Sequence, residues 1–176
     1  PCGKCHVCRG LDDGSVLDVV ELDAASNNGV DSIRALIEES NFTPTTAKYR
    51  VYIIDEVHML SVSAFNALLK TLEEPPAHVI FILATTEVHK LLPTILSRCQ
   101  RFDFRRIAPE DIAGRLEWVC TQENVTIDHD AAMLIAVTAD GGMRDALSIL
   151  DQCIGRSDGH VTYGLVAVSY THLTLP

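Results

Sequence analysis

The feature that most constrains this chain is an apolar run that ends on two adjacent carboxylates. Residues 51–54 read Val-Tyr-Ile-Ile, and Asp55 and Glu56 follow at once. A short apolar run with β-branched members is typical of a buried strand. Packing gives no reason for two ionisable side chains at its carboxyl end. Nucleotide hydrolysis gives a reason, because it uses one acid at a strand end to hold Mg²⁺ and a neighbouring acid to handle the attacking water. The alternative interpretation is that the two acids simply begin a solvated turn after the strand.

Composition limits the classes of protein to consider. The 176 residues, 47% apolar and 22% charged, suffice for one globular domain with a substantial core, or for one and a half. Neither a signal-peptide pattern nor an apolar run near the ~18 residues of a membrane span is present. The net charge of −10 argues against a free-standing nucleic-acid binder, but not against a subunit that reaches DNA within an assembly. Because the chain begins with Pro1 rather than Met, we expect a fragment.

Strand and helix patterns alternate up to about Ile107, and only helical patterns follow. This order predicts an α/β domain over residues 1–107, with a parallel sheet covered on both faces, joined to a three-helix domain over residues 108–163. The stretch 164–176 has no charged residue and no helical stripe, and we expect it to be a non-native tail. The expected strands are 16–22, 50–54, 79–84 and 101–105, and the expected helices are 31–40, 61–74, 93–97, 109–123, 128–139 and 143–154.

The six cysteines fall into two groups. Three lie close together as Cys2-x-x-Cys5-x-x-Cys8, and the others are scattered at positions 99, 120 and 153. In a chain without an export signal, clustered cysteines indicate a metal site rather than disulfides. Zinc suits such thiolates; an iron–sulfur site is the rival, but the usual following Cys-Pro is missing. The scattered cysteines are expected to be buried small apolar residues.

Four motifs together carry a family resemblance. Residues 55–58, Asp-Glu-Val-His, have the form of a DExH Walker B box, and FILATTE, LLPTILSRCQRF and GGMRDALSILDQ follow in that order. With them the chain, from Cys2 to about Val161, resembles the gamma/tau subunits of bacterial DNA polymerase III, the AAA+ ATPases of the clamp loader. The resemblance implies a P-loop NTPase AAA+ parallel sheet with an inserted zinc module at about residues 2–8, followed by a small all-helical lid domain.

The resemblance also implies roles for the residues at the strand ends. Asp55 would contact Mg²⁺, directly or through water, and Glu56 would polarise the attacking water. Thr86, or with less support Thr85, would be sensor 1, within reach of the γ-phosphate or the water. A simple turn or cap is the alternative for both threonines.

Two arginines receive roles in the same way. Arg98, in Ser-Arg-Cys, resembles an arginine finger that acts on ATP held by the neighbouring subunit, where its delocalised charge stabilises the transferring phosphoryl group. Arg144 resembles sensor 2, which reports the nucleotide state to the lid domain. The alternatives are an ordinary surface arginine at position 98 and an exposed pair of Arg144 with Asp145.

Cys2, Cys5 and Cys8 resemble three of the four ligands of the family's structural zinc site. The family's fourth ligand is a cysteine several residues upstream, which this chain lacks. His6 could replace it only with strained geometry.

One departure from the family pattern is that no GxxxxGK[ST] sequence occurs in residues 1–176. The resemblance places this phosphate-binding loop upstream of Cys2, so we expect that the chain as given neither binds ATP tightly nor hydrolyses it.

The implied function is that of an ATP-driven motor subunit, using ATP and Mg²⁺, that loads the sliding clamp onto primer-template DNA in the bacterial cytoplasm. Implied partners are delta, delta-prime and further gamma/tau subunits, with no membrane and no polymerase site in the chain itself. A non-hydrolysing delta-prime-type subunit is the main alternative. A DExH helicase is a weaker alternative, because it would need a second motor domain that this sequence does not show. A zinc-binding interaction module would leave Asp55, Thr86 and Arg98 unexplained.

Overall fold

The computed structural model describes residues 2–173, with side chains described up to residue 169. The chain divides into two compact units, residues 1–101 and 102–176. None of the described helices is both long and apolar enough to cross a membrane.

Unit 1 is built on a parallel sheet, as the sequence predicts, but among the described residues this sheet has three strands and not the four expected. The strands β1 (Val19–Asp23), β2 (Arg50–Asp55) and β3 (Val79–Leu83) are hydrogen-bonded in the order β1-β2-β3. Asp23 is paired with Asp55, and Ile54 with Leu83, so all three strands end together. The segments that follow the three strands therefore meet at one edge of the sheet.

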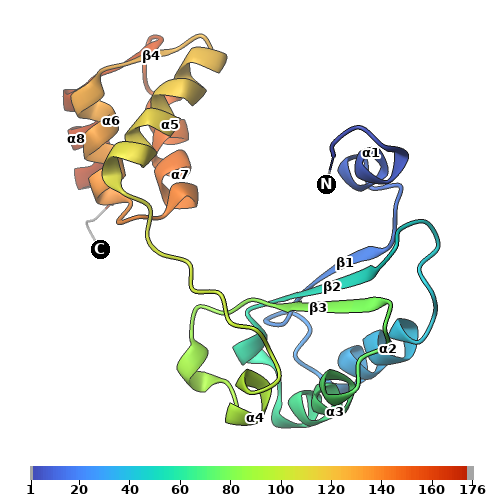
Figure 1. Ribbon diagram of the computed structural model, residues 1–176. Helices are drawn as coiled ribbons and strands as arrows, with labels where there is room; N and C mark the ends of the chain where they lie inside the picture. The colour runs from blue at the N-terminus through green and yellow to red at the C-terminus, as the bar shows by residue number, and fades with distance from the viewer. Residues whose placement is uncertain (1, 174–176) are drawn as a thin grey trace. The chain divides into compact units, whose positions relative to one another are not determined.

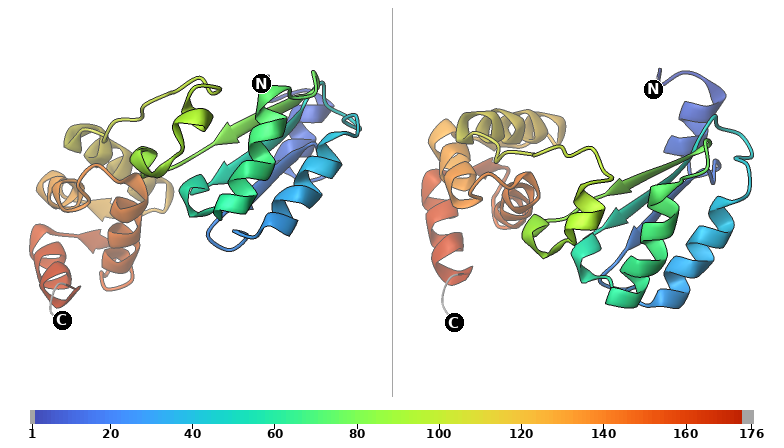
Figure 2. Two further views of the ribbon diagram at one scale, coloured as in Figure 1. Left: turned by 90° about the horizontal axis from the view of Figure 1, so that it is seen from below. Right: turned by 60° about the horizontal axis from the view of Figure 1, so that its bottom comes forward.

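Helices α2 (Val30–Ser40) and α3 (Val62–Glu73) cover one face of this sheet (Figures 1 and 2). Their apolar side chains pack against Tyr52 and Ile54 of β2, which are fully buried. Ser61 caps α3, because its hydroxyl accepts a hydrogen bond from the Ala64 N–H at 3.2 Å. The helices of unit 1 are α1 (His6–Asp12), α2 (Val30–Ser40), α3 (Val62–Glu73) and α4 (Pro93–Leu96), with 3₁₀ turns at Val57–Met59 and Val88–Lys90.

The expectation that both faces of the sheet are covered is wrong for unit 1 as the structure describes it. Ile80 and Ile82 of β3 are 41% and 47% exposed, on the face opposite α2 and α3. The cause is topological. Strands that follow one another in chain order through right-handed crossovers place both connecting helices on the same side of the sheet. The apolar content of β3 alone does not reveal this.

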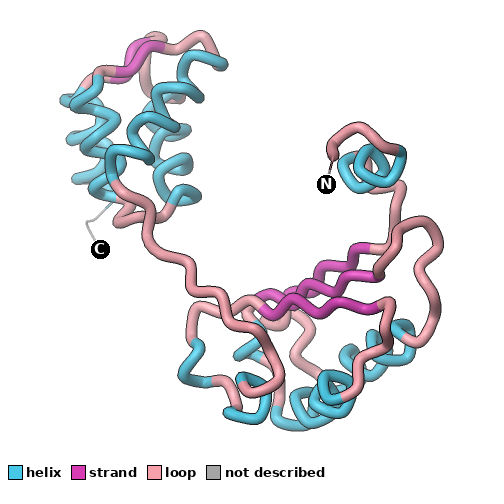
Figure 3. Tube along the Cα trace, viewed as in Figure 1, coloured by secondary structure: helices cyan, strands magenta, loops and turns pink. Residues whose placement is uncertain are grey.

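The predicted strand at 101–105 is also wrong. These residues run as coil (Figure 3) and belong to neither described sheet. Phe102 and Phe104, whose alternation with polar residues prompted the prediction, are 71% and 97% exposed. A strand needs a neighbour to satisfy its backbone N–H and C=O groups, and alternation alone cannot provide one.

Unit 2 is a helical domain around one apolar core. The predicted helices are present as α5 (Pro109–Gln122), α6 (His129–Thr138) and α7 (Met143–Ile154), and their core includes Leu116, Ile135 and Leu150. The structure adds α8 (Tyr163–Leu173), which places Val166 in this core, so the expected non-native tail is helical up to Leu173. The last three residues lie outside the described range, and the non-native origin of the tail stays a prediction. A parallel ladder of β4 (Thr126–Ile127) and β5 (His160–Val161) was not predicted, because two-residue strands are too short to show alternation.

Candidate active site

Acidic side chains gather where the strands of unit 1 end. Asp23 ends β1 beside Asp55 of β2. The carboxylate of Asp23 accepts hydrogen bonds from the Ser26 hydroxyl at 2.6 Å and the Ala25 N–H at 2.8 Å, and these bonds lower the pKa of Asp23. Asp55 is exposed, and its Oδ1 accepts the Glu56 N–H at 2.9 Å. Exposed carboxylates at such an edge suit a hard cation such as Mg²⁺.

Glu56 has an unusual backbone conformation. Its φ of 47° and ψ of 44° lie in the left-handed region, which non-glycine residues rarely adopt. The flanking backbone holds it there, because the Asp55 carbonyl accepts from the Ala24 N–H and the Val57 N–H donates to the Ala84 carbonyl, both at 3.0 Å. Non-glycine residues in this region cluster at functional sites, where surrounding structure maintains the strain.

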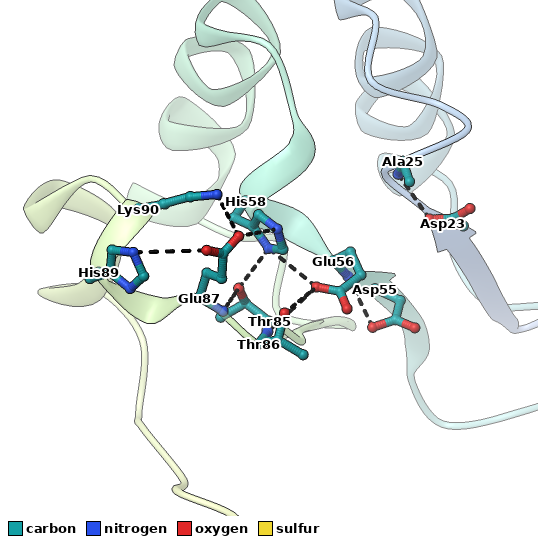
Figure 4. Close-up of polar contacts among 10 residues, drawn as sticks. All are labelled: Asp23, Ala25, Asp55, Glu56, His58, Thr85, Thr86, Glu87, His89 and Lys90. Atoms are coloured by element: carbon teal, nitrogen blue, oxygen red, sulfur yellow. Dashed lines mark hydrogen bonds and ion pairs between the residues drawn. The ribbon is translucent and has the colours of Figure 1, made fainter. Parts of the chain in front are cut away.

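This turn brings Glu56 against Thr86, which follows β3. The Thr86 hydroxyl donates to Glu56 Oε2 at 3.1 Å, and the Thr86 N–H donates to the same oxygen at 3.4 Å (Figure 4). The structure therefore brings together two of the predicted site residues, with Asp55 adjacent in the chain. Thr85, the less favoured candidate, instead hydrogen-bonds His58.

Sequence reasoning missed two members of this cluster, His58 and Glu87. The His58 imidazole lies between Glu56 and Glu87, with Nδ1 at 3.2 Å from Glu56 Oε2 and Nε2 at 3.1 Å from Glu87 Oε2 (Figure 4). The hydrogen bond from Lys90 is the largest cause that lowers the pKa of Glu87, and His58 adds to it. The DExH spacing marked His58 as part of a motif, but its partners Thr85 and Glu87 lie 27 and 29 residues further along the chain and left no local signal.

The two predicted arginines belong to other elements of the structure. Arg98, just after α4, donates to Glu73 Oε1 at 2.6 Å and to the Thr94 carbonyl at 2.7 Å, and its side chain is 31% exposed. Arg144 belongs to unit 2, in the first turn of α7. Within residues 2–101, the contacts of Arg98 thus hold its guanidinium beside the end of α3 rather than against Glu56.

The three clustered cysteines converge at the start of the chain. Their sulfur atoms all lie within 4.8 Å of one another, with Cys2 and Cys8 3.9 Å apart. Tetrahedral zinc with Zn–S bonds near 2.3 Å places sulfurs about 3.8 Å apart, so this donor set fits zinc. Hydrogen bonds from the Lys4 and Cys5 N–H groups lower the pKa of the Cys2 thiol to about 7. In the part of the chain that the structure describes, His6 does not join the group, which consists of the three cysteines.

Comparison with protein families then places the chain. Residues 1–108 match the family described as "DNA polymerase III, delta subunit", and residues 111–159 match "DNA polymerase III clamp loader subunit, ATPase lid domain". The first match alone covers more than half of the 176 residues. The chain belongs to the family of DNA polymerase III clamp-loader subunits.

Its relatives in this clamp-loader family are gamma and tau subunits, which confirms the predicted resemblance. The chain is 59% identical over 157 residues to DNA polymerase III subunit tau of Bacillus subtilis, covering 89% of the chain and 28% of that protein. It is 47% identical over 162 residues to the subunit tau of Escherichia coli, covering 92% and 25%. The chain therefore spans about a quarter of the length of these relatives.

Solved structures support the fold. A RuvB variant from Thermotoga maritima matches with a TM-score of 0.72 at 15% identity, over 90% of the chain and 54% of that structure. This likeness shows the fold alone, a parallel sheet together with a helical domain. A DNA polymerase III gamma subunit-related protein from Thermotoga maritima matches with a TM-score of 0.52 at 26% identity, over 85% and 54%.

Proposed function

We propose that the protein containing this chain is an ATP-driven motor subunit of the DNA polymerase III clamp loader. The observation that carries the proposal is the contact between Glu56 and Thr86 at the ends of β2 and β3, beside the exposed Asp55. An acid at a strand end can hold Mg²⁺ or orient the attacking water, and a polar residue at the end of the neighbouring strand can reach the γ-phosphate or that water. The clamp-loader relatives support this proposal.

In the proposed reaction, each residue has a separate task. Asp55 would hold Mg²⁺, which would neutralise charge on the phosphate oxygens. Glu56 orients the attacking water and accepts its proton, while Thr86 fixes the Glu56 carboxylate and reaches the γ-phosphate or the water. Arg98 stabilises the phosphoryl group at the neighbouring subunit's site, and Arg144 connects the lid to the nucleotide.

Hydrolysis in an assembly of this kind depends on the partners. We assign as partners the delta, delta-prime and other gamma/tau subunits, the sliding clamp and primer-template DNA, in the bacterial cytoplasm. ATP binding would hold the clamp open, and primed DNA would trigger hydrolysis and release. Because the chain has a net charge of −10, DNA contact would fall to the assembly rather than to this chain alone.

A non-hydrolysing delta-prime-type subunit is the second candidate. The match of residues 1–108 to a family described as the delta subunit favours it. In that case Asp55 and Glu56 would be relics, and the protein would contribute Arg98 to a neighbour without hydrolysing ATP itself.

ATPase assays on two proteins test the proposal. We expect the full-length protein, assembled with its partner subunits, to hydrolyse ATP when clamp and primed DNA are present. Residues 1–176 alone should show neither tight ATP binding nor turnover, because they contain no GxxxxGK[ST] sequence. Turnover by residues 1–176 would contradict this expectation, and an assembly that hydrolyses ATP at the parental rate when this subunit carries Glu56→Gln would favour the delta-prime-type subunit.

We further propose that Cys2, Cys5 and Cys8 bind a structural zinc ion. The spacing of their sulfur atoms and the lowered pKa of Cys2 support it, since zinc binds thiolates. A site closed by four protein ligands would leave no open position for chemistry, so the metal would stabilise the module.

Metal analysis of the full-length protein checks this assignment. About one zinc per chain is expected, and Cys8→Ser should reduce it to near zero because a thiolate ligand is lost. Cys99→Ala, which removes a half-buried thiol outside the cluster, is the matched control and should retain zinc. Equal zinc content in the Cys8→Ser variant and the parent protein would refute the site.

A further inference from the structure

We propose that His58 is a positioning residue that holds the Glu56 carboxylate against Thr86. This inference rests on the proposed ATPase function, and it assigns to the histidine of the DExH sequence a task beyond packing. His58 would not touch the nucleotide or the attacking water. It would act through Glu56.

Both ring nitrogen atoms of His58 have polar partners. Its Nδ1 lies 2.9 Å from Thr85 Oγ1 and 3.2 Å from Glu56 Oε2, and its Nε2 lies 3.1 Å from Glu87 Oε2 (Figure 4). The imidazole is only 7% exposed, whereas the side chains of Glu56 and Glu87 are each 35% exposed. A nearly buried ring between two accessible carboxylates, with both nitrogen atoms engaged, has one available orientation.

Three contacts converge on a single oxygen of Glu56. Oε2 accepts from the Thr86 hydroxyl and N–H, and His58 Nδ1 approaches the same atom. A glutamate side chain has several rotatable bonds, and holding it in one geometry costs conformational entropy that such contacts offset. A carboxylate anchored through one oxygen can present the other to a water molecule in a fixed direction, which general-base catalysis requires.

The far side of His58 is anchored in turn. Glu87 accepts a hydrogen bond from Lys90 Nζ at 2.5 Å, and its backbone N–H donates to Thr85 Oγ1 at 3.0 Å. His89 Nε2 also faces Glu87, at 3.9 Å. His58 therefore links the end of β2 to the segment after β3, and the position of Glu56 depends on both.

The inference is tested in the assembled full-length ATPase with two substitutions of His58, each of which keeps a nitrogen atom near one of the two ring nitrogen positions. His58→Asn keeps a donor near Nδ1, toward Glu56, and His58→Gln keeps a donor near Nε2, toward Glu87. We expect His58→Ala and His58→Gln to lower kcat by about 10²-fold with KM for ATP nearly unchanged, because misplacing a reacting group costs about that much. His58→Asn should recover most of the activity. His129→Asn is the matched control, since that side chain is 77% exposed on α6 and has no role in the proposed site, and it should behave like the parent protein.

Glu56→Gln, measured beside these variants, distinguishes failure of the proposed ATPase function from failure of the positioning role alone. If Glu56→Gln keeps full turnover, the proposed function fails. If it abolishes turnover while His58→Ala and His58→Gln leave kcat unchanged, only the positioning role is overturned. Equal losses in His58→Asn and His58→Gln would also overturn it. Thermal unfolding of each variant shows whether it is folded. If His58→Ala does not fold, the kcat values of His58→Asn and His58→Gln decide whether His58 has the positioning role.

Discussion

Glu56→Gln in the assembled clamp loader is expected to lower kcat for ATP hydrolysis by about 10²–10⁴-fold, the usual contribution of a general base. ATP affinity should change little. The amide keeps the shape of the side chain, and its oxygen can still accept the hydrogen bond that Thr86 donates at 3.1 Å. It cannot accept a proton from water. Single-turnover hydrolysis and equilibrium binding of ATP, measured on the same preparation, separate the two effects.

Glu38→Gln is a matched control for this experiment. Glu38 is an exposed carboxylate on α2, and its neutralisation should leave both kcat and ATP affinity as in the parent protein. A Glu56→Gln variant that hydrolyses ATP at the parental rate would rule out the general-base role and favour the delta-prime-type subunit. Loss of ATP affinity together with kcat would instead indicate that Glu56 shapes the nucleotide site.

The central part of this site was predictable because its residues directly follow the ends of two strands that the sequence pattern marks. An apolar run that stops at Asp55, and a second that stops before Thr85 and Thr86, place their polar residues at one edge wherever the strands are parallel neighbours. The structure has both strands, paired through Ile54 and Leu83. Sequence pattern thus predicted which residues meet, although their chemical roles stay predictions.

The parts that could not be predicted depend on long-range geometry. Glutamate has no preference for the left-handed turn that Glu56 adopts, which is imposed by backbone hydrogen bonds to Ala24 and Ala84. The bridge from His58 to Glu87 spans 29 residues and has no periodic signal. For segment 101–105 the local signal is present but misleading. Its residues alternate as in a strand, but a strand also needs a neighbouring strand to pair with, and this segment has none in the described structure.

Arg98→Ala should produce the second large effect, a loss of about 10³-fold or more in ATP turnover of the assembly. The contact with Glu73 at 2.6 Å and the partial exposure of Arg98 leave its guanidinium fixed at the surface, where a neighbouring subunit could be reached. Arg98→Lys should be nearly as inactive, because a point charge cannot replace the planar fork at a phosphoryl group. ATP binding to the substituted subunit itself should be unaffected.

Mixing the two inactive variants distinguishes action in trans from a local defect. An Arg98→Ala subunit still carries Glu56, and a Glu56→Gln subunit still carries Arg98. Where a Glu56→Gln subunit supplies its Arg98 to the site of an Arg98→Ala subunit, that site is intact. Mixed assemblies should therefore regain part of the activity that each variant lacks alone. Arg98→Ala subunits that lose turnover yet gain nothing from Glu56→Gln neighbours would show that Arg98 acts within its own subunit. The ion pair with Glu73 would then be a structural contact at the end of α3.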